Sequence, residues 1–301
     1  MKYIRQIFPF LLIVISSSCS TSNQHNGNEI AFDKQAHRGG RGLTPENTIA
    51  SQKTAIDYDC TLEMDLQMSR DKKIVVSHDG YFSSDFCLTP QGDTMSKTDG
   101  LGRLIYNMPY DSVAKYEVGL KPHPGFPRQK KMHAVKPLLS VLIDSVEAYA
   151  QRKHHLNHYN IEIKSSPESD GKYYSTLEEY IDSAMKIIVD KGIASRTMMQ
   201  SFDVRALKIL QEKYPKVKTS YLVGAKSNKT AQQYIDALGF KPAVFSPEFS
   251  VVTKDLVEAF HKEDIIVIPW TVNRLEDMER LKSLCVDGVI TDYPDIFARV
   301  K

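Results

Sequence analysis

The chain has 301 residues, of which 42% are hydrophobic and 25% are charged. This composition is typical of a soluble globular protein, and it excludes intrinsic disorder, a collagen and a membrane protein with many spans. The 39 basic and 37 acidic residues give a formal net charge of +2, so no bulk charge indicates nucleic acid as a partner.

Residues 1–18 are typical of an export signal. Lys2 and Arg5 form a short basic region, and the following stretch from Ile7 to Ile15 is almost wholly apolar. This stretch is too short to predict a membrane span. We therefore predict that residues 1–18 are a cleaved signal peptide.

Cys19 follows directly after Ser16-Ser17-Ser18. Small residues before a cysteine resemble a bacterial lipobox, whose Cys is acylated after cleavage, although such boxes usually carry Leu where this chain has Ser16. An ordinary cleaved signal with a chance Cys is the alternative. The resemblance predicts a lipid anchor on Cys19 and a polar tether over residues 19–31. It also predicts a place in the bacterial cell envelope, as a periplasmic or outer-membrane lipoprotein.

The remaining cysteines are Cys60, Cys87 and Cys285. Their odd number excludes a complete disulfide framework, and their spacing matches no zinc motif. The cysteines therefore indicate neither a disulfide scaffold nor a zinc site.

From about residue 32 onward, apolar strand-like runs alternate with helix-like stretches. Several runs are continuous, such as Ile265-Ile266-Val267-Ile268, which is typical of parallel strands covered on both faces. The predicted strands are 35–39, 61–68, 73–78, 159–164, 197–202, 219–223, 243–246, 265–271 and 288–291.

Helix starts are indicated by capping residues. Ser175 and Glu178 have the spacing of a capping box, and Asn273 and Glu276 have a related spacing before a second amphipathic stretch. Asp203 precedes a third and is predicted to cap it. These signals place helices between the predicted strands.

Repeated strand–helix alternation over residues 32–301 fits one α/β domain. We predict a TIM (β/α)8 barrel, a fold that typically needs about 250 residues. A doubly wound sheet has the same local pattern, but no Gly-x-Gly-x-x-Gly follows the first strand, which disfavours a dinucleotide site. Residues 80–135 are rich in Gly, Pro, Asp and Lys and have few periodic apolar residues. We therefore predict that they are inserted after an early strand.

Three carboxylates lie on predicted strands. Glu63 and Asp65 are two residues apart, so they point to the same face, and Glu162 lies on another strand. Neighbouring carboxylates repel each other unless a cation lies between them. A solvated strand face is the alternative for the pair, and an ion pair with Lys164 is the alternative for Glu162. Three carboxylates on parallel strands are what a hard-cation site needs.

Other reactive side chains fall where predicted strands end. His37 and Arg38 precede a turn at Gly39, and His78 closes an apolar run. Trp270, the only Trp in the chain, ends another run. The alternative interpretations are that the two histidines lie in surface turns and that Trp270 is simply buried in the core. Because parallel α/β folds place active sites at the carboxyl ends of their strands, the clusters together predict one site.

The order of these clusters resembles that of the glycerophosphodiester phosphodiesterase family, from about Gln35 to Phe297. The matching segments are AHRGG, TPENT, LEMDLQMSRDKKIVVSHD, IEIKS, QSFD, PWTVN and DGVITDYPD. The resemblance implies a TIM barrel with an inserted segment after an early strand. It also implies that His37 and His78 are an acid–base pair and that Glu63, Asp65 and Glu162 are metal ligands. Arg38 and Lys164 would bind the phosphate, Glu46 and Asn47 would form a supporting turn, and Trp270 would be the aromatic at the substrate cleft.

This site implies metal-dependent hydrolysis of a small-molecule glycerophosphodiester to glycerol 3-phosphate and an alcohol. Oxygen-only ligands favour Mg²⁺ or Ca²⁺ over Zn²⁺. Arg38 can bind two phosphate oxygens at once, and Lys164 adds a point charge. One His takes a proton from the attacking hydroxyl, which belongs to water or to the glycerol, and the other supplies the leaving alkoxide. The sequence does not assign the two roles.

Three alternative functions stay open. The first is a related barrel phospholipase that acts on lysolipid or sphingolipid headgroups. The second is a non-catalytic binding lipoprotein that kept the barrel, which the intact site residues argue against. The third is a dinucleotide-dependent α/β enzyme, which the missing Gly-rich turn disfavours.

Overall fold

The computed structural model describes residues 24–25, 28–29, 31–227 and 229–300. The chain divides into two units, Met1–Ile30 and Ala31–Lys301. In the first unit, β1 (Gln24–His25) and β2 (Asn28–Glu29) pair antiparallel. The predicted signal peptide and Cys19 lie outside the described residues.

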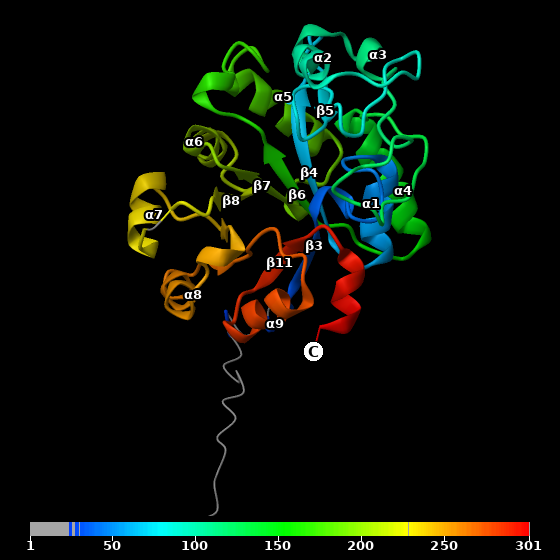
Figure 1. Cartoon of the computed structure of the whole chain (residues 1–301). Coiled ribbons are helices and arrows are strands. Elements are labelled where there is room, and N and C mark those ends of the chain that lie inside the picture. Colours follow the sequence, from blue (N-terminus) through cyan, green and yellow to red (C-terminus); the bar gives the residue numbers. More distant parts are fainter. Residues whose placement is uncertain (1–23, 26–27, 30, 228, 301) are drawn as a thin grey trace, which may run out of the picture. The chain divides into compact units, whose positions relative to one another are not determined.

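The second unit is built on a parallel barrel (Figure 1). Parallel strands hydrogen-bond in the order β10-β9-β8-β7-β6-β4-β3-β11. Backbone bonds at 2.9 Å from Asp287 N to Val267 O and from Ile290 N to Pro269 O connect the two end strands. The strands are β3 (Asp33–Ala36), β4 (Thr61–Met68), β6 (Tyr159–Ile163), β7 (Thr197–Ser201), β8 (Lys218–Val223), β9 (Val244–Pro247), β10 (Ile266–Val267) and β11 (Gly288–Thr291).

Helices surround the strands in Figure 1. Their apolar faces pack on the barrel, with Leu142, Ile181 and Leu207 fully buried in the common core. This arrangement confirms the predicted TIM barrel and excludes the doubly wound sheet. The outer helices are α1 (Ile49–Asp57), α4 (Leu139–Arg152), α5 (Leu177–Asp190), α6 (Val204–Lys213), α7 (Ala231–Leu238), α8 (Lys254–His261) and α9 (Leu275–Ser283).

Strand positions follow the hydrophobic pattern closely, with three differences. The predicted strand 35–39 is too long at its carboxyl end, because β3 ends at Ala36 and His37–Gly39 form a 3-10 helix. The predicted strand 73–78 contains β5 (Ile74–Val76), which pairs antiparallel with β4 and lies off the barrel order. The predicted strand 265–271 is reduced to β10, because Pro269 has no N–H group to continue a ladder. The segments 61–68 and 288–291 have the predicted bounds.

The helix caps were predicted with mixed success. Asp203 caps α6 as predicted, since its carboxylate accepts a hydrogen bond from Arg205 N at 3.0 Å. The capping box at residue 175 is wrong by one position, because Thr176 is the residue that caps α5. Asn273 does not cap α9, because its side chain is bonded to Asp292, where the amide Nδ2 donates to Oδ2 at 2.7 Å.

The segment 80–135 forms an irregular insertion after β5, with two short helices, α2 (Lys97–Gly102) and α3 (Tyr110–Val113). It has its own apolar cluster, in which Phe82, Cys87 and Ile105 are fully buried. The insertion therefore carries enough buried apolar surface to hold a defined structure beside the barrel. Across the described ranges, no helix is both long and apolar enough to span a bilayer.

Candidate active site

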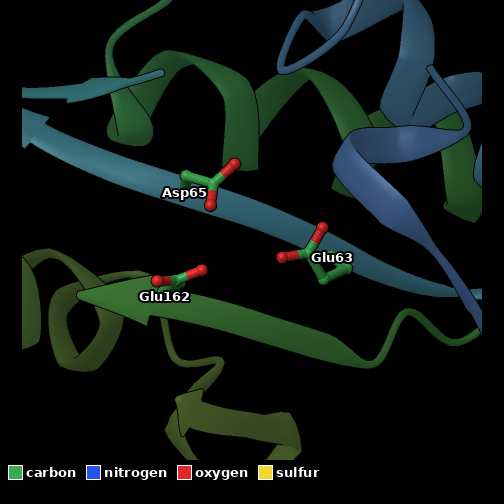
Figure 2. Close-up of side chains that lie close together, drawn as sticks. All are labelled: Glu63, Asp65 and Glu162. Atoms are coloured by element: carbon green, nitrogen blue, oxygen red, sulfur yellow. The ribbon is translucent and has the colours of Figure 1, made fainter. Parts of the chain in front are cut away.

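Three carboxylates meet on two neighbouring strands of the barrel. Glu63 and Asp65 lie on β4, and Glu162 lies on β6, where it is the register partner of Asp65. Each offers a ligand oxygen within 4.8 Å of the others, and all three side chains are buried. Figure 2 shows the three carboxylates turned toward one another. Their burial excludes the solvated strand face that the sequence left open.

The donor set fits a hard divalent cation. Asp65 Oδ1 is buried without a hydrogen-bond partner, although it lies 3.7 Å from Lys164 Nζ. Burial and the neighbouring Asp65 raise the pKa of Glu63 well above its usual range, and burial also raises the pKa of Glu162. Three buried carboxylates this close need compensating positive charge, and an all-oxygen set suits Mg²⁺ or Ca²⁺.

Glu63 is held by one group that follows β3 and by another on β7. Its Oε2 accepts a hydrogen bond from Arg38 N at 2.5 Å, and its Oε1 accepts one from Gln200 Nε2 at 2.8 Å. Gln200 is in turn bonded to Asn160, whose amide also donates to Gln35. This polar network inside the barrel orients the carboxylate of Glu63.

Two cations flank the acidic cluster. Arg38 is buried; its Nη1 lies 2.9 Å from Glu46 Oε1, and its Nε lies 3.4 Å from Asp65 Oδ2. Lys164 Nζ lies 3.0 Å from Glu162 Oε1, so the ion pair considered from the sequence is present within the cluster. Among the described residues, buried Arg38 Nε has no hydrogen-bond partner, and its nearest carboxylate oxygen is Asp65 Oδ2.

The turn at residues 46–47 supports these groups. Glu46 binds the Arg38 guanidinium, and Asn47 forms two bonds with Asp65: its Nδ2 donates to Oδ2 at 2.8 Å, and its Oδ1 accepts from Asp65 N at 3.1 Å. Asn47 has a φ of 55°, a left-handed conformation that Asn tolerates better than most residues. The turn thereby aims its amide back at β4.

His37 is oriented by a carboxylate from the last strand. Its Nδ1 lies 2.6 Å from Asp292 Oδ1, which leaves Nε2 as the nitrogen available to a substrate. Asp292 also accepts hydrogen bonds from Arg41 Nε and Asn273 Nδ2, each at 2.7 Å. Burial lowers the pKa of His37 to about 4, and the charge of Asp292 opposes this only in part. The imidazole is therefore neutral at pH 7.

His78 follows β5 and faces a cavity of about 240 Å³. Its Nδ1 lies 2.8 Å from Asp79 Oδ1. Glu162 and Lys164 line the same cavity. The structure therefore brings His78 together with the acidic cluster, although Glu162 lies 84 positions further along the chain.

Aromatic side chains form the outer wall of this cavity. Tyr81, Tyr173 and Phe202 line it. Trp270 packs edge to face against Phe202, with ring centroids 5.4 Å apart, and its Nε1 donates to Ser246 O at 2.9 Å. Trp270 is half-buried: it contacts the cavity through Phe202 and packs on the apolar cluster that includes Ile268 and Ile290.

Sequence reasoning assigned no role to Asp292, Arg41 or Gln200. Asp292 stands directly after a predicted strand and lies in the matched segment DGVITDYPD, but neither signal assigned it a role. Arg41 and Gln200 reach the site through partners that are distant in the chain. Their contributions become visible only in the folded barrel.

This fold and this site are those of a barrel phosphoric diester hydrolase. The chain belongs to the glycerophosphoryl diester phosphodiesterase family, whose family model matches residues 37–296.

Known relatives cover most of the chain. It is 27% identical to a glycerophosphodiester phosphodiesterase from Caldanaerobacter subterraneus, covering 86% of this chain and 93% of that protein. It is 22% identical to a human lysophospholipase D, covering 86% of this chain and 81% of that protein.

Solved structures show the same fold. A Silicibacter pomeroyi protein described as a glycerophosphoryl diester phosphodiesterase superposes with a TM-score of 0.81 at 26% identity, over 90% of this chain and 93% of that chain. An Oleispira antarctica phosphodiesterase, solved with its product sn-glycerol-3-phosphate, superposes with a TM-score of 0.69 at 23% identity, over 88% and 95%.

Proposed function

We propose that this protein hydrolyses glycerophosphodiesters to glycerol 3-phosphate and an alcohol, with a divalent cation and a pair of histidines. The observation that carries the proposal is the meeting of His78, Glu162 and Lys164 at one cavity, beside the buried Glu63 and Asp65. The related phosphodiesterases and the product-bound neighbour support it.

Substrate binding rests on charge. Glu63, Asp65 and Glu162 would hold Mg²⁺ or Ca²⁺, which when bound polarises the phosphoryl group and neutralises its charge. Arg38 would hold two oxygens of the phosphodiester, and Lys164 would contribute a point charge. With three acids, two cationic side chains and a dication, the site keeps one net positive charge, which suits a monoanionic diester.

The proton transfers divide between the histidines. We assign His37 as the general base, because its Nδ1–H donates to Asp292, which leaves Nε2 to accept a proton, and because burial keeps the ring neutral. His78 would donate to the leaving alkoxide from its place on the cavity wall. The attacking group is water or the 2-hydroxyl of the glycerol, the latter giving a cyclic phosphate first.

A product assay tests the proposed function. Purified protein is incubated with glycerophosphocholine, glycerophosphoethanolamine and glycerophosphoglycerol, and glycerol 3-phosphate is measured with and without excess chelator. We expect release of glycerol 3-phosphate that stops in chelator and returns when Mg²⁺ or Ca²⁺ is added. Binding in a calorimetric titration with no product would instead identify a non-catalytic binding lipoprotein.

A second candidate function is hydrolysis of lysolipids, which the relationship to a human lysophospholipase D favours. A lysolipid needs room for an acyl chain, whereas the cavity beside His78 measures about 240 Å³ and is partly lined by polar groups. Faster turnover of lysophosphatidylcholine than of glycerophosphocholine would make this second function the principal one.

We also propose that the protein is exported and that its mature form is tethered to a membrane through Cys19. In this proposal residues 1–18 are removed, residues 19–31 form the tether, and residues 32–301 form the barrel domain. The support is the apolar run that ends in small residues before that Cys. In a bacterial host, the native form should partition with membranes and the Cys19→Ala form should be found in the soluble envelope fraction. Equal membrane partitioning of the two forms would rule out the lipid anchor.

A further inference from the structure

Lys136 carries an ammonium group that is buried beside the active site. Its backbone lies next to β5, where Val76 N donates to Pro137 O at 2.8 Å. This pairing sets Lys136 opposite Ser77, the first residue after the strand. Only 5% of Lys136 is exposed, which is rare for a lysine.

The ammonium has few compensating contacts. Its Nζ donates to Ser77 Oγ at 2.6 Å and lies 5.5 and 5.9 Å from the ring centres of Phe82 and Phe86. Among the described residues, the ion pairs include no carboxylate bound to Lys136. Asp79 and Glu46 sense its charge without forming a direct ion pair with it. Burying a charge without a direct ion pair is costly, and an apolar side chain of similar size would avoid that cost. Folding stability therefore does not explain this lysine.

The contacts of Lys136 lead to His78. Ser77 Oγ, which accepts from the ammonium, donates to Asp79 O at 2.7 Å. Asp79 Oδ1 lies 2.8 Å from His78 Nδ1, and Gln67 Nε2 donates to His78 O at 2.9 Å. The turn 77–79 is thus held by Lys136 on one side and by Gln67 on the other.

The charge of Lys136 acts on the same turn. Burial raises the pKa of Asp79, but the bond and charge of His78, together with the charge of Lys136, outweigh burial and keep this pKa below its usual range. Asp79 therefore stays ionised as the partner of His78.

We propose that Lys136 is a positioning residue for His78: acting through Ser77, its ammonium holds the turn that aims the imidazole into the cavity. This inference rests on the proposed role of His78 in proton transfer. It predicts that removing the charge harms turnover without harming the fold.

The test compares Lys136→Met with Lys121→Met. Lys121 lies on the insertion that precedes Lys136 and also donates to a neutral oxygen, Ser84 O, which is not part of the His78 turn. In Lys136→Met we expect kcat for glycerophosphocholine to fall about 10–100-fold, the usual cost of a misplaced catalytic group, while KM changes less than about twofold. The Tm should be unchanged or higher, because a buried charge is removed. Lys121→Met should keep the wild-type kcat.

A second variant and an NMR measurement keep the test decisive. Ser77→Ala removes the hydroxyl that accepts from Lys136 and donates to Asp79 O. It should lower kcat at an unchanged Tm, and the two substitutions should be non-additive because they break one link. The imidazole resonances of His78 should shift in both variants while those of His37 stay in place. Ser77→Ala decides the test if Lys136→Met does not fold.

Two outcomes would overturn the inference. One is wild-type kcat and unshifted His78 resonances in both variants, and the other is a loss of kcat that simply follows a loss of Tm. A wild-type protein that hydrolyses no glycerophosphodiester would contradict the proposed function instead. The NMR comparison would still test the placement of His78 in that case, because it needs no turnover.

Discussion

Replacing either His37 or His78 with Ala should lower kcat/KM by about 10²–10⁴-fold, the usual worth of a positioned proton transfer. Both imidazoles are held through Nδ1 by a carboxylate, His37 by Asp292 and His78 by Asp79. The two losses should be non-additive, because both groups serve one transition state. Initial rates on glycerophosphocholine measure the effect.

The leaving group should separate the two roles. A p-nitrophenyl ester needs little help from an acid, so the loss in His78→Ala should shrink with that substrate while the loss in His37→Ala should persist. If the p-nitrophenyl ester restored the activity of His37→Ala and not that of His78→Ala, the assignment of acid and base would be reversed.

The pH profile of kcat/KM should be bell-shaped, because one imidazole must be neutral and the other charged. The acidic limb should lie well below the usual His range, because burial lowers the pKa of His37 to about 4 and the ring gains a proton only below that pH. The basic limb should disappear in His78→Ala when the activated ester is used.

His133→Ala is the matched control for both substitutions. This imidazole also has a carboxylate partner, Glu117, but it is 85% exposed on the insertion. It should retain wild-type kcat/KM. Near-normal turnover in His37→Ala or His78→Ala would show that the affected residue is only a turn histidine.

Glu63→Gln should abolish most of the activity by weakening the binding of the divalent cation. The substitution keeps the size of the side chain but removes one of three buried carboxylates whose oxygens lie within 4.8 Å of one another. Isothermal titration with Mg²⁺ or Ca²⁺ should give a clear binding isotherm for the wild type and a much weaker one for the variant. Glu63→Ala should lose activity in the same way.

Thermal unfolding gives a second measure of the same site. A cation at 100 times its Kd stabilises the fold by about 2.7 kcal/mol, so the wild-type Tm should rise on metal addition and the Glu63→Gln Tm should not. Without metal, the variant should be at least as stable as the wild type, because charge repulsion and burial already raise the pKa of Glu63.

Glu212→Gln is the control for this experiment, since Glu212 is an exposed residue on α6. It should leave metal binding, Tm and activity unchanged. Full activity of the metal-free wild type in excess chelator would contradict the proposed metal dependence.

The local pattern of the sequence determined the α/β class of the domain and the acidic face of β4. Alternation along a strand has a period of two, so Glu63 and Asp65 had to share a face whatever lay around them. Continuous apolar runs such as 265–268 likewise indicated strands covered on both sides. These inferences needed only neighbours in the chain, which is why the bounds of β4 and β11 agree with the structure.

Patterns that depend on a distant partner were misread. The sequence of β5 is equally suited to a barrel strand, and only its antiparallel pairing with β4 shows that it lies off the barrel. Asn273 has the type and spacing of a helix cap, but the neighbouring carboxylate of Asp292 takes its amide. In such cases, hydrogen bonds to distant residues override the local preference for a strand or a helix cap. These bonds form only after the strands have assembled.

The supporting contacts of the site were decided by tertiary structure alone. His37 and Asp292 are 255 positions apart, and Gln200 reaches Glu63 across 137 positions. Lys136 meets Ser77 because the chain returns along β5 after the insertion. A sequence pattern identifies which side chains can do chemistry, but barrel closure decides which of them touch, because it brings the ends of distant strands to one place.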